Sequence, residues 1–170
     1  MRKQLVRMVV GVVALAVVWG ATGGPASAGT AAAERVDGGT PASIAVGVVR
    51  LDGQQEVPPA DPDGRGTFAY VAFDSRICYV LTAQKIEPAT MAHIHVGPAG
   101  VNGPIVIALI APTDGFSADC IEAVPDGSVE NTTEVLLQSE LDAIIANEPG
   151  FYVNVHNAPF PGGAIRAQLR

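Results

Sequence analysis

The sequence predicts an all-β fold, an antiparallel β-sandwich or barrel with one short helix. Apolar side chains alternate in several segments, as in "GTFAYVAFD" at residues 66–74, where Phe68, Tyr70 and Ala72 share one face. Alternation at a period of two indicates strands with one buried face. Gly- and Pro-containing turns separate these segments, and only one stretch shows helical spacing. Short strands at this spacing are typical of antiparallel sandwiches and barrels.

The candidate strands follow from this alternation or from continuous apolar runs. They are residues 43–51, 66–74, 77–86, 91–97, 104–110, 151–157 and 164–170, with 128–137 as a weaker candidate.

One helix is expected near residues 140–147, in the segment "QSELDAIIANEPG". Ser139 is a suitable N-cap, with Asp142 at the third helical position. Leu141, Ile144 and Ile145 would share the apolar face. Pro149-Gly150 would end the helix.

The N-terminal residues have the pattern of a secretory signal peptide. Three basic residues precede the apolar run 8–19, and Ala26-Ser27-Ala28 has the small-x-small form of a cleavage site. The apolar run is shorter than the roughly 20 residues that span a bilayer. We therefore expect a signal peptide over 1–28 with cleavage after Ala28, a flexible linker over 29–42, and one domain over 43–170. The mature protein would be secreted or held at the cell surface, with no stable membrane span.

Charge restricts the partners of the mature chain. Removing residues 1–28 leaves seven basic and 17 acidic residues, a net charge of −10. Nucleic acid is therefore not an expected partner, because binding it needs a basic surface.

The two cysteines, Cys78 and Cys120, indicate one disulfide in an exported chain. Two buried free thiols are the alternative.

All three histidines are expected on the polar side of their strands. In "MAHIHVG", Ile94 and Val96 share one face, which places His93 and His95 on the other. In "FYVNVHN", the same alternation places His156 opposite the apolar side chains. Three imidazoles on neighbouring strands form a set that suits copper or zinc. The alternative is that they are ordinary polar residues on the solvent face of a sheet.

Three other polar residues accompany the histidines. Asn154 and Arg166 would face the side of His156 if the last two strands pair. They could orient the imidazoles as supporting residues around a metal, or form a solvated cross-strand pair, and we favour the solvated pair. Glu56 could be a ligand or could support a turn, and we favour the turn. The glycine-rich stretch after His95 lacks the features of a phosphate-binding loop and is interpreted as two turns.

Three stretches resemble the signature blocks of the CHRD (chordin-type) domain family. They are "LDGQQEVPP" at 51–59, "AHIHVGPAGVNGPIVIAL" at 92–109 and "GFYVNVHNAPFPGGAIRAQL" at 150–169. The chain is similar to single-domain exported bacterial members. The resemblance implies an immunoglobulin-like β-sandwich and no particular activity.

Three functions are compatible with these features. The first is a non-enzymatic binding module that holds one transition metal, copper or zinc, through His93, His95 and His156. The second is an extracellular protein- or glycan-interaction domain without a metal. The last in order of preference is a copper-dependent oxidoreductase, for which no catalytic residue can be named.

Overall fold

The computed structural model of the protein describes residues 43–170. The expected signal peptide, its cleavage site after Ala28 and the linker over 29–42 lie outside the described residues. The elements, in chain order, are β1 (Ile44–Asp52), η1 (Gly53–Gln55), β2 (Arg65–Phe73), β3 (Arg76–Gln84), β4 (Ala89–Val96), β5 (Ile105–Leu109), β6 (Phe116–Glu122), α1 (Gln138–Ala146), η2 (Glu148–Gly150), β7 (Phe151–Asn157) and β8 (Ile165–Gln168).

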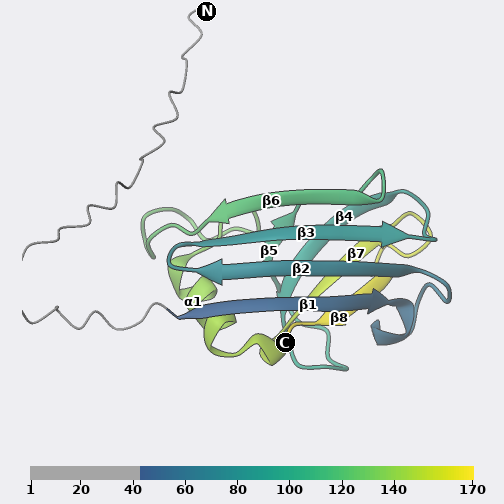
Figure 1. Ribbon diagram of the computed structural model, residues 1–170, viewed down its shortest axis with the longest axis horizontal. Helices are drawn as coiled ribbons and strands as arrows, with labels where there is room; N and C mark the ends of the chain where they lie inside the picture. The colour runs from purple at the N-terminus through teal and green to yellow at the C-terminus, as the bar shows by residue number, and fades with distance from the viewer. Residues whose placement is uncertain (1–42) are drawn as a thin grey trace, which may run out of the picture. The chain divides into compact units, whose positions relative to one another are not determined.

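The strands form two layers joined at one corner (Figure 1). The hydrogen-bonded order is β5-β4-β7-β8-β1-β2-β3-β6, and every pair in it is antiparallel. β8 and β1 share only the pair Arg166–Asp52, and there the sheet turns from the layer of β4, β5, β7 and β8 to the layer of β1, β2, β3 and β6. The predicted antiparallel all-β fold with one short helix is confirmed.

The core lies between the two layers, where alternate side chains of every long strand point inward. In β2 the residues Phe68, Tyr70 and Ala72 are buried, as the alternation predicts. The largest apolar side chains with almost no exposed surface are Leu51, Phe68, Ile77, Leu81, Ile94, Ile107, Leu136, Leu141, Ile144, Ile165 and Leu169. Burying an aliphatic side chain of this size contributes about 1.5–3 kcal/mol.

Helix α1 closes one end of the sandwich and begins two residues earlier than a cap at Ser139 predicts (Figure 1). Its N-cap position is Leu137, whose backbone N–H donates to the Glu140 carboxylate at 3.0 Å. The predicted cap at Ser139 is wrong, because the backbone N–H and hydroxyl of Ser139 both bind the carboxylate of Asp126. The predicted apolar face is confirmed for Leu141 and Ile144, which are fully buried.

Two strand predictions differ from the structure. Residues 128–137 form turns rather than a strand, and only Leu137 makes an isolated bridge, to Val124. Their β-branched residues suggested a strand, but most of these side chains are exposed and pack against nothing. Conversely, β6 was not predicted, because its sequence "FSADCIE" has no clear alternation. It forms at the sheet edge by pairing with β3.

The disulfide Cys78–Cys120 is confirmed. The two residues lie directly opposite each other on β3 and β6, with a Cα–Cα distance of 3.9 Å. The bond therefore fixes the edge strand that the sequence pattern identifies least well.

Among the described residues, no helix is long and apolar enough to cross a membrane.

Candidate metal site

The three histidines lie on the face of β4 and β7 that points away from the core. Ala92 and Ile94 of β4 are buried in the core, so strand alternation directs His93 and His95 to the other face. In the register of the sheet, His93 lies opposite Asn154, and Asn154 lies opposite Arg166. The predicted shared face of the histidines is confirmed.

This face is not a solvent face. The exposed fractions of His93, His95 and His156 are 8%, 8% and 6%. The prediction of ordinary polar residues in contact with solvent is therefore wrong. Residues 97–104 and 157–163 each place a backbone carbonyl against one of the imidazoles, and they form a roof over this face of the sheet.

Arg166 holds loop 97–104, one of the two roof segments, by hydrogen bonds. Its guanidinium donates to the carbonyls of Pro98 and Val101 at 3.2 and 2.9 Å, and to the side chain of Asn102 at 3.3 Å. The guanidinium carbon also lies 3.3 Å from the centre of the Tyr152 ring, a cation–π contact. Arg166 is therefore a buried anchor for loop 97–104, and the preferred interpretation as half of a solvated pair is wrong.

The imidazoles converge around the side chain of Asn154. His93 Nδ1 lies 3.0 Å from His156 Nε2. Nε2 of His95 and Nε2 of His156 each lie 3.1 Å from Asn154 Oδ1. One nitrogen from each histidine can be chosen so that all three lie within 4.8 Å of one another. Asn154 itself is 2% exposed, so its predicted solvated role is also wrong.

Two backbone carbonyls determine which nitrogens of His95 and His156 carry hydrogen. His95 Nδ1 lies 2.9 Å from the carbonyl of Gly103, and His156 Nδ1 lies 3.0 Å from the carbonyl of Pro161. Because a carbonyl only accepts hydrogen bonds, both Nδ1 atoms must be the donors. Both Nε2 atoms then present a lone pair toward Asn154. Metal-binding histidines usually have this arrangement, with the second ring nitrogen donating to an outer carbonyl.

Loop 97–104 can approach His95 because residue 103 is glycine. A Cβ atom at this position would lie 1.7 Å from the carbonyl oxygen of Val96. The sequence predicted turns around Gly97-Pro98 and Asn102-Gly103-Pro104, but the structure has one turn in this loop, closed by the hydrogen bond from Val101 N–H to the Pro98 carbonyl at 3.2 Å. The residues after this turn deliver the Gly103 carbonyl to the imidazole of His95.

Burial keeps the three imidazoles neutral at pH 7. Burial, the largest cause, and the neighbouring His156 and His95 together lower the pKa of His93 to about 4. Burial also lowers the pKa of His95 and of His156, although hydrogen bonds to the backbone carbonyls oppose it. A metal ion would not have to remove a proton from any ring, since neutral imidazole is the ligating form. The His93 hydrogen would, however, have to move from Nδ1, which donates to His156 Nε2 in the metal-free chain, to Nε2.

Three of the distances are close to those in the coordination of a small transition metal, and the chosen imidazole nitrogens all lie within 4.8 Å of one another. A tetrahedral zinc ion with bonds of about 2.0–2.1 Å has ligands about 3.3 Å apart. The observed spacings of 3.0–3.1 Å between His93, His156, Asn154 and His95 atoms are close to that value. The set is three nitrogens and one amide oxygen, which suits zinc and copper.

Glu56 is buried near the same cluster and is 5% exposed. Burial raises its pKa to about 7, against the lowering effects of the Arg166 charge and of hydrogen bonds from Val57 and Asn154. Its carboxylate lies against Gly163, where a Cβ atom would be only 2.4 Å from Oε1. Glu56 therefore connects the segment after η1 to the β7–β8 loop.

Tyr152 belongs to the site but was not singled out from the sequence. Its ring stacks on His95 with the centres 4.6 Å apart and the planes 7° from parallel, and Arg166 lies against it. Tyr152 is two residues before Asn154 on β7, so strand alternation places it on the histidine face. A tyrosine on that face was the available signal.

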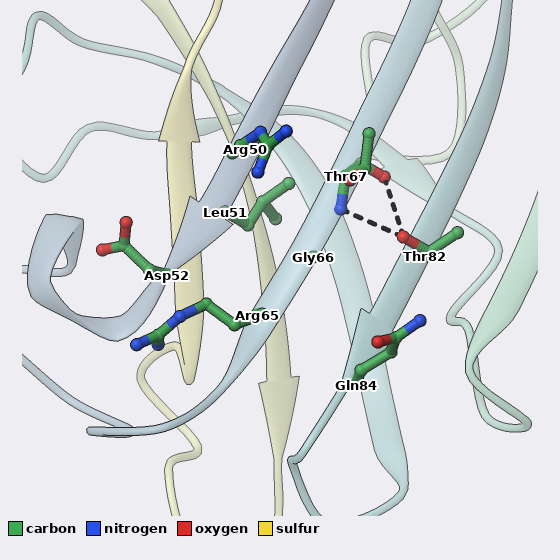
Figure 2. A pocket seen from close by; sticks show the side chains of 8 residues that line it. All are labelled: Arg50, Leu51, Asp52, Arg65, Gly66, Thr67, Thr82 and Gln84. Carbon is green, nitrogen blue, oxygen red and sulfur yellow. Dashed lines mark hydrogen bonds between the residues drawn. The ribbon is translucent and has the colours of Figure 1, made fainter.

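A hollow of about 320 Å³ lies on β1, β2 and β3, and none of the histidines lines it (Figure 2). Its polar groups already serve the fold. The Thr82 hydroxyl accepts a hydrogen bond from the backbone N–H of Thr67 at 3.1 Å, and the Asp52 carboxylate accepts from the backbone of η1.

The fold and the site together define a class of protein: an antiparallel β-sandwich whose outer face carries a roofed cluster of histidines. The family model of the CHRD domain matches residues 48–169. The chain belongs to the CHRD domain family, as the three signature blocks suggested. No curated protein and no solved structure matches the chain.

The signature blocks meet at the histidine cluster. The first supplies Glu56, the second His93, His95 and the roof loop, and the third His156 together with Asn154 and Arg166. The stretches that identify the family are thus the stretches that build this site.

Proposed function

We propose that this chain is an exported, non-enzymatic binding module that holds one transition metal ion through His93, His95 and His156. The observation that carries this proposal is that one nitrogen of each imidazole lies within 4.8 Å of the others. The outer nitrogens of His95 and His156 donate to the carbonyls of Gly103 and Pro161. Copper and zinc are the ions that this donor set favours.

The environment of Asn154 Oδ1 supports a cation at this place. The oxygen faces the lone pairs of two Nε2 atoms, and all three atoms are acceptors. Acceptors crowded in this way repel one another unless a cation lies among them. In a metal-free chain, the Asn154 amide can instead turn over and donate its two N–H groups to the imidazoles. Its oxygen then faces Glu56 in place of the N–H that donates to that carboxyl, so this form is satisfied when Glu56 is protonated.

Isothermal titration of the metal-free protein with Zn(II) and with Cu(II) tests the proposal. We expect one ion per chain for the wild type and none for a variant with His93, His95 and His156 all replaced by glutamine. Glutamine keeps polar side chains in the buried cluster, and circular dichroism verifies the fold of the variant. Glu130→Gln removes an exposed carboxylate from the segment that precedes α1 and serves as the matched control. Equal binding by the wild type and the glutamine variant contradicts the proposal and leaves the histidines with a structural role.

Export is the second part of the proposal. The Cys78–Cys120 disulfide supports it, because disulfides persist mainly in oxidising compartments. Expression in a secreting bacterium, followed by N-terminal sequencing of the extracellular protein, should give a mature chain that begins at Gly29. Retention of an intact N-terminus inside the cell contradicts export.

A further inference from the structure

Met91 lies beside the histidine cluster and has no role in the site described above. It is two residues before His93 on β4, so alternation places its side chain on the histidine face. In the sheet register it lies directly opposite His156 of β7. Side chains in directly opposite positions have Cβ atoms about 4.5–5.5 Å apart. The Met91 thioether therefore neighbours the imidazole of His156 across the strands.

A break in the strand register precedes Met91. Pairing of β4 with β7 shifts between Ala89 and Met91, so that Thr90 is an extra residue in the ladder. A bulge of this kind redirects the side chains next to it and is common beside functional sites. A second shift, between Ile94 and His95, occurs where β4 pairs with β5. The histidines of β4 are thus bounded on both sides by irregular pairing.

Met91 also differs from the histidines in its exposure. Its side chain is 45% exposed, whereas each imidazole is 8% exposed or less. The roof segments cover the cluster beside Gly103 and Pro161, on the far sides of His95 and His156. Met91 therefore lies where the cluster meets solvent. It is also the single methionine of residues 43–170, since the other two are Met1 and Met8.

We propose that Met91 is a metal ligand that makes the site selective for Cu(I), with the ion bound by the Met91 thioether, His93 and His156. A thioether is a soft ligand that favours Cu(I), whereas Zn(II) takes imidazole nitrogens without it. His93 and His156 are already in contact through Nδ1 and Nε2 at 3.0 Å, and Met91 is adjacent to both. Methionine has a flexible side chain, so the sulfur can reach the ion with little rearrangement of the strands. This inference rests on the proposed metal-binding function and adds the oxidation state of the ion and its exposed ligand.

Met91→Leu tests the inference with a change of similar volume that keeps the apolar character. The Cu(I) affinity is measured without oxygen, by competition with a chromophoric Cu(I) chelator, and the Zn(II) affinity is measured on the same samples. We expect Met91→Leu to weaken Cu(I) binding by about tenfold or more and to leave Zn(II) binding within about twofold of wild type. Val96→Leu, a change at a partly exposed position on the core-side face of β4, is the matched control and should alter neither affinity.

A direct spectroscopic readout comes from the single methionine of the mature domain. Protein labelled with ¹³C at the methionine methyl group should give one resonance from Met91, which Cu(I) shifts and Zn(II) leaves nearly in place. Equal Cu(I) affinities for wild type and Met91→Leu, or a methyl resonance that Cu(I) does not move, overturn the inference while metal binding itself stands. Failure of the wild type to bind either ion overturns the proposed function and this inference together.

Discussion

Acidification of the metal-free protein should destabilise it largely through His93. The native structure holds the pKa of this imidazole at about 4, because the ring is buried beside two other imidazoles. In the unfolded chain the pKa of a histidine is about 6.5. Between these two values the unfolded chain binds a proton that the native chain excludes. The contribution of His93 to the free energy of unfolding is therefore fully present above pH 6.5 and is lost as the pH falls toward 4.

The size of the effect follows from the two pKa values. Each pKa unit of difference corresponds to about 1.4 kcal/mol, so the loss between pH 7 and pH 4 reaches about 2–3 kcal/mol for His93 alone. This is a large part of the roughly 5–15 kcal/mol that stabilises a typical domain.

Urea denaturation followed by far-ultraviolet circular dichroism, with a chelator present, measures this loss. His93→Gln replaces the imidazole with a polar side chain that does not titrate. We expect the variant to lose about 2–3 kcal/mol less than wild type between pH 7 and pH 4. The comparison cancels the contributions of carboxylates that titrate in both proteins. If both proteins lose the same free energy over this range, His93 is not excluded from protonation in the native state and the reasoning is wrong.

Three further predictions concern the surroundings of the cluster. Glu56→Gln should remove a contribution of opposite sign. The native carboxyl has a pKa of about 7 and takes up a proton as the pH falls, while the unfolded one stays ionised down to about 4.5. Denaturation at pH 7 and pH 5 should therefore show that wild type gains stability from this group and that the variant does not, and an equal change in the free energy of unfolding for both proteins would contradict it. Asn154→Asp should destabilise the metal-free protein, because a carboxylate cannot donate to the two imidazoles. Addition of Zn(II) should nevertheless raise the thermal midpoint of this variant more than that of wild type. A smaller increase than in wild type would argue against a metal at this position. Reduction of Cys78–Cys120, or replacement of both cysteines by serine, should lower the free energy of unfolding by about 4 kcal/mol from the chain entropy of a loop of this length, and urea curves with unchanged midpoints would show that the bond does not constrain the unfolded chain.

Local sequence was sufficient for seven of the eight strands and for the face on which each histidine lies. A strand directs alternate side chains to opposite faces, so Ile94 in the core requires His93 and His95 on the other side. The same rule placed Asn154 with His156. It failed for β6, whose position depends on pairing with β3 and on the disulfide, and for residues 128–137, whose β-branched side chains find no sheet to pack against.

Sequence alone determined the family, the strand pattern and the set of side chains that share a face. Tertiary structure alone decided that this face is buried, since burial depends on loops that are remote in sequence. Loop 97–104 covers the face because Gly103 can approach Val96 and because Arg166, far along the chain, holds the loop carbonyls. The order of β4, β7 and β8 brings His156 within 3.0 Å of His93. Alternation specifies a direction for each side chain, whereas distances between strands and coverage by loops arise only when the chain has folded.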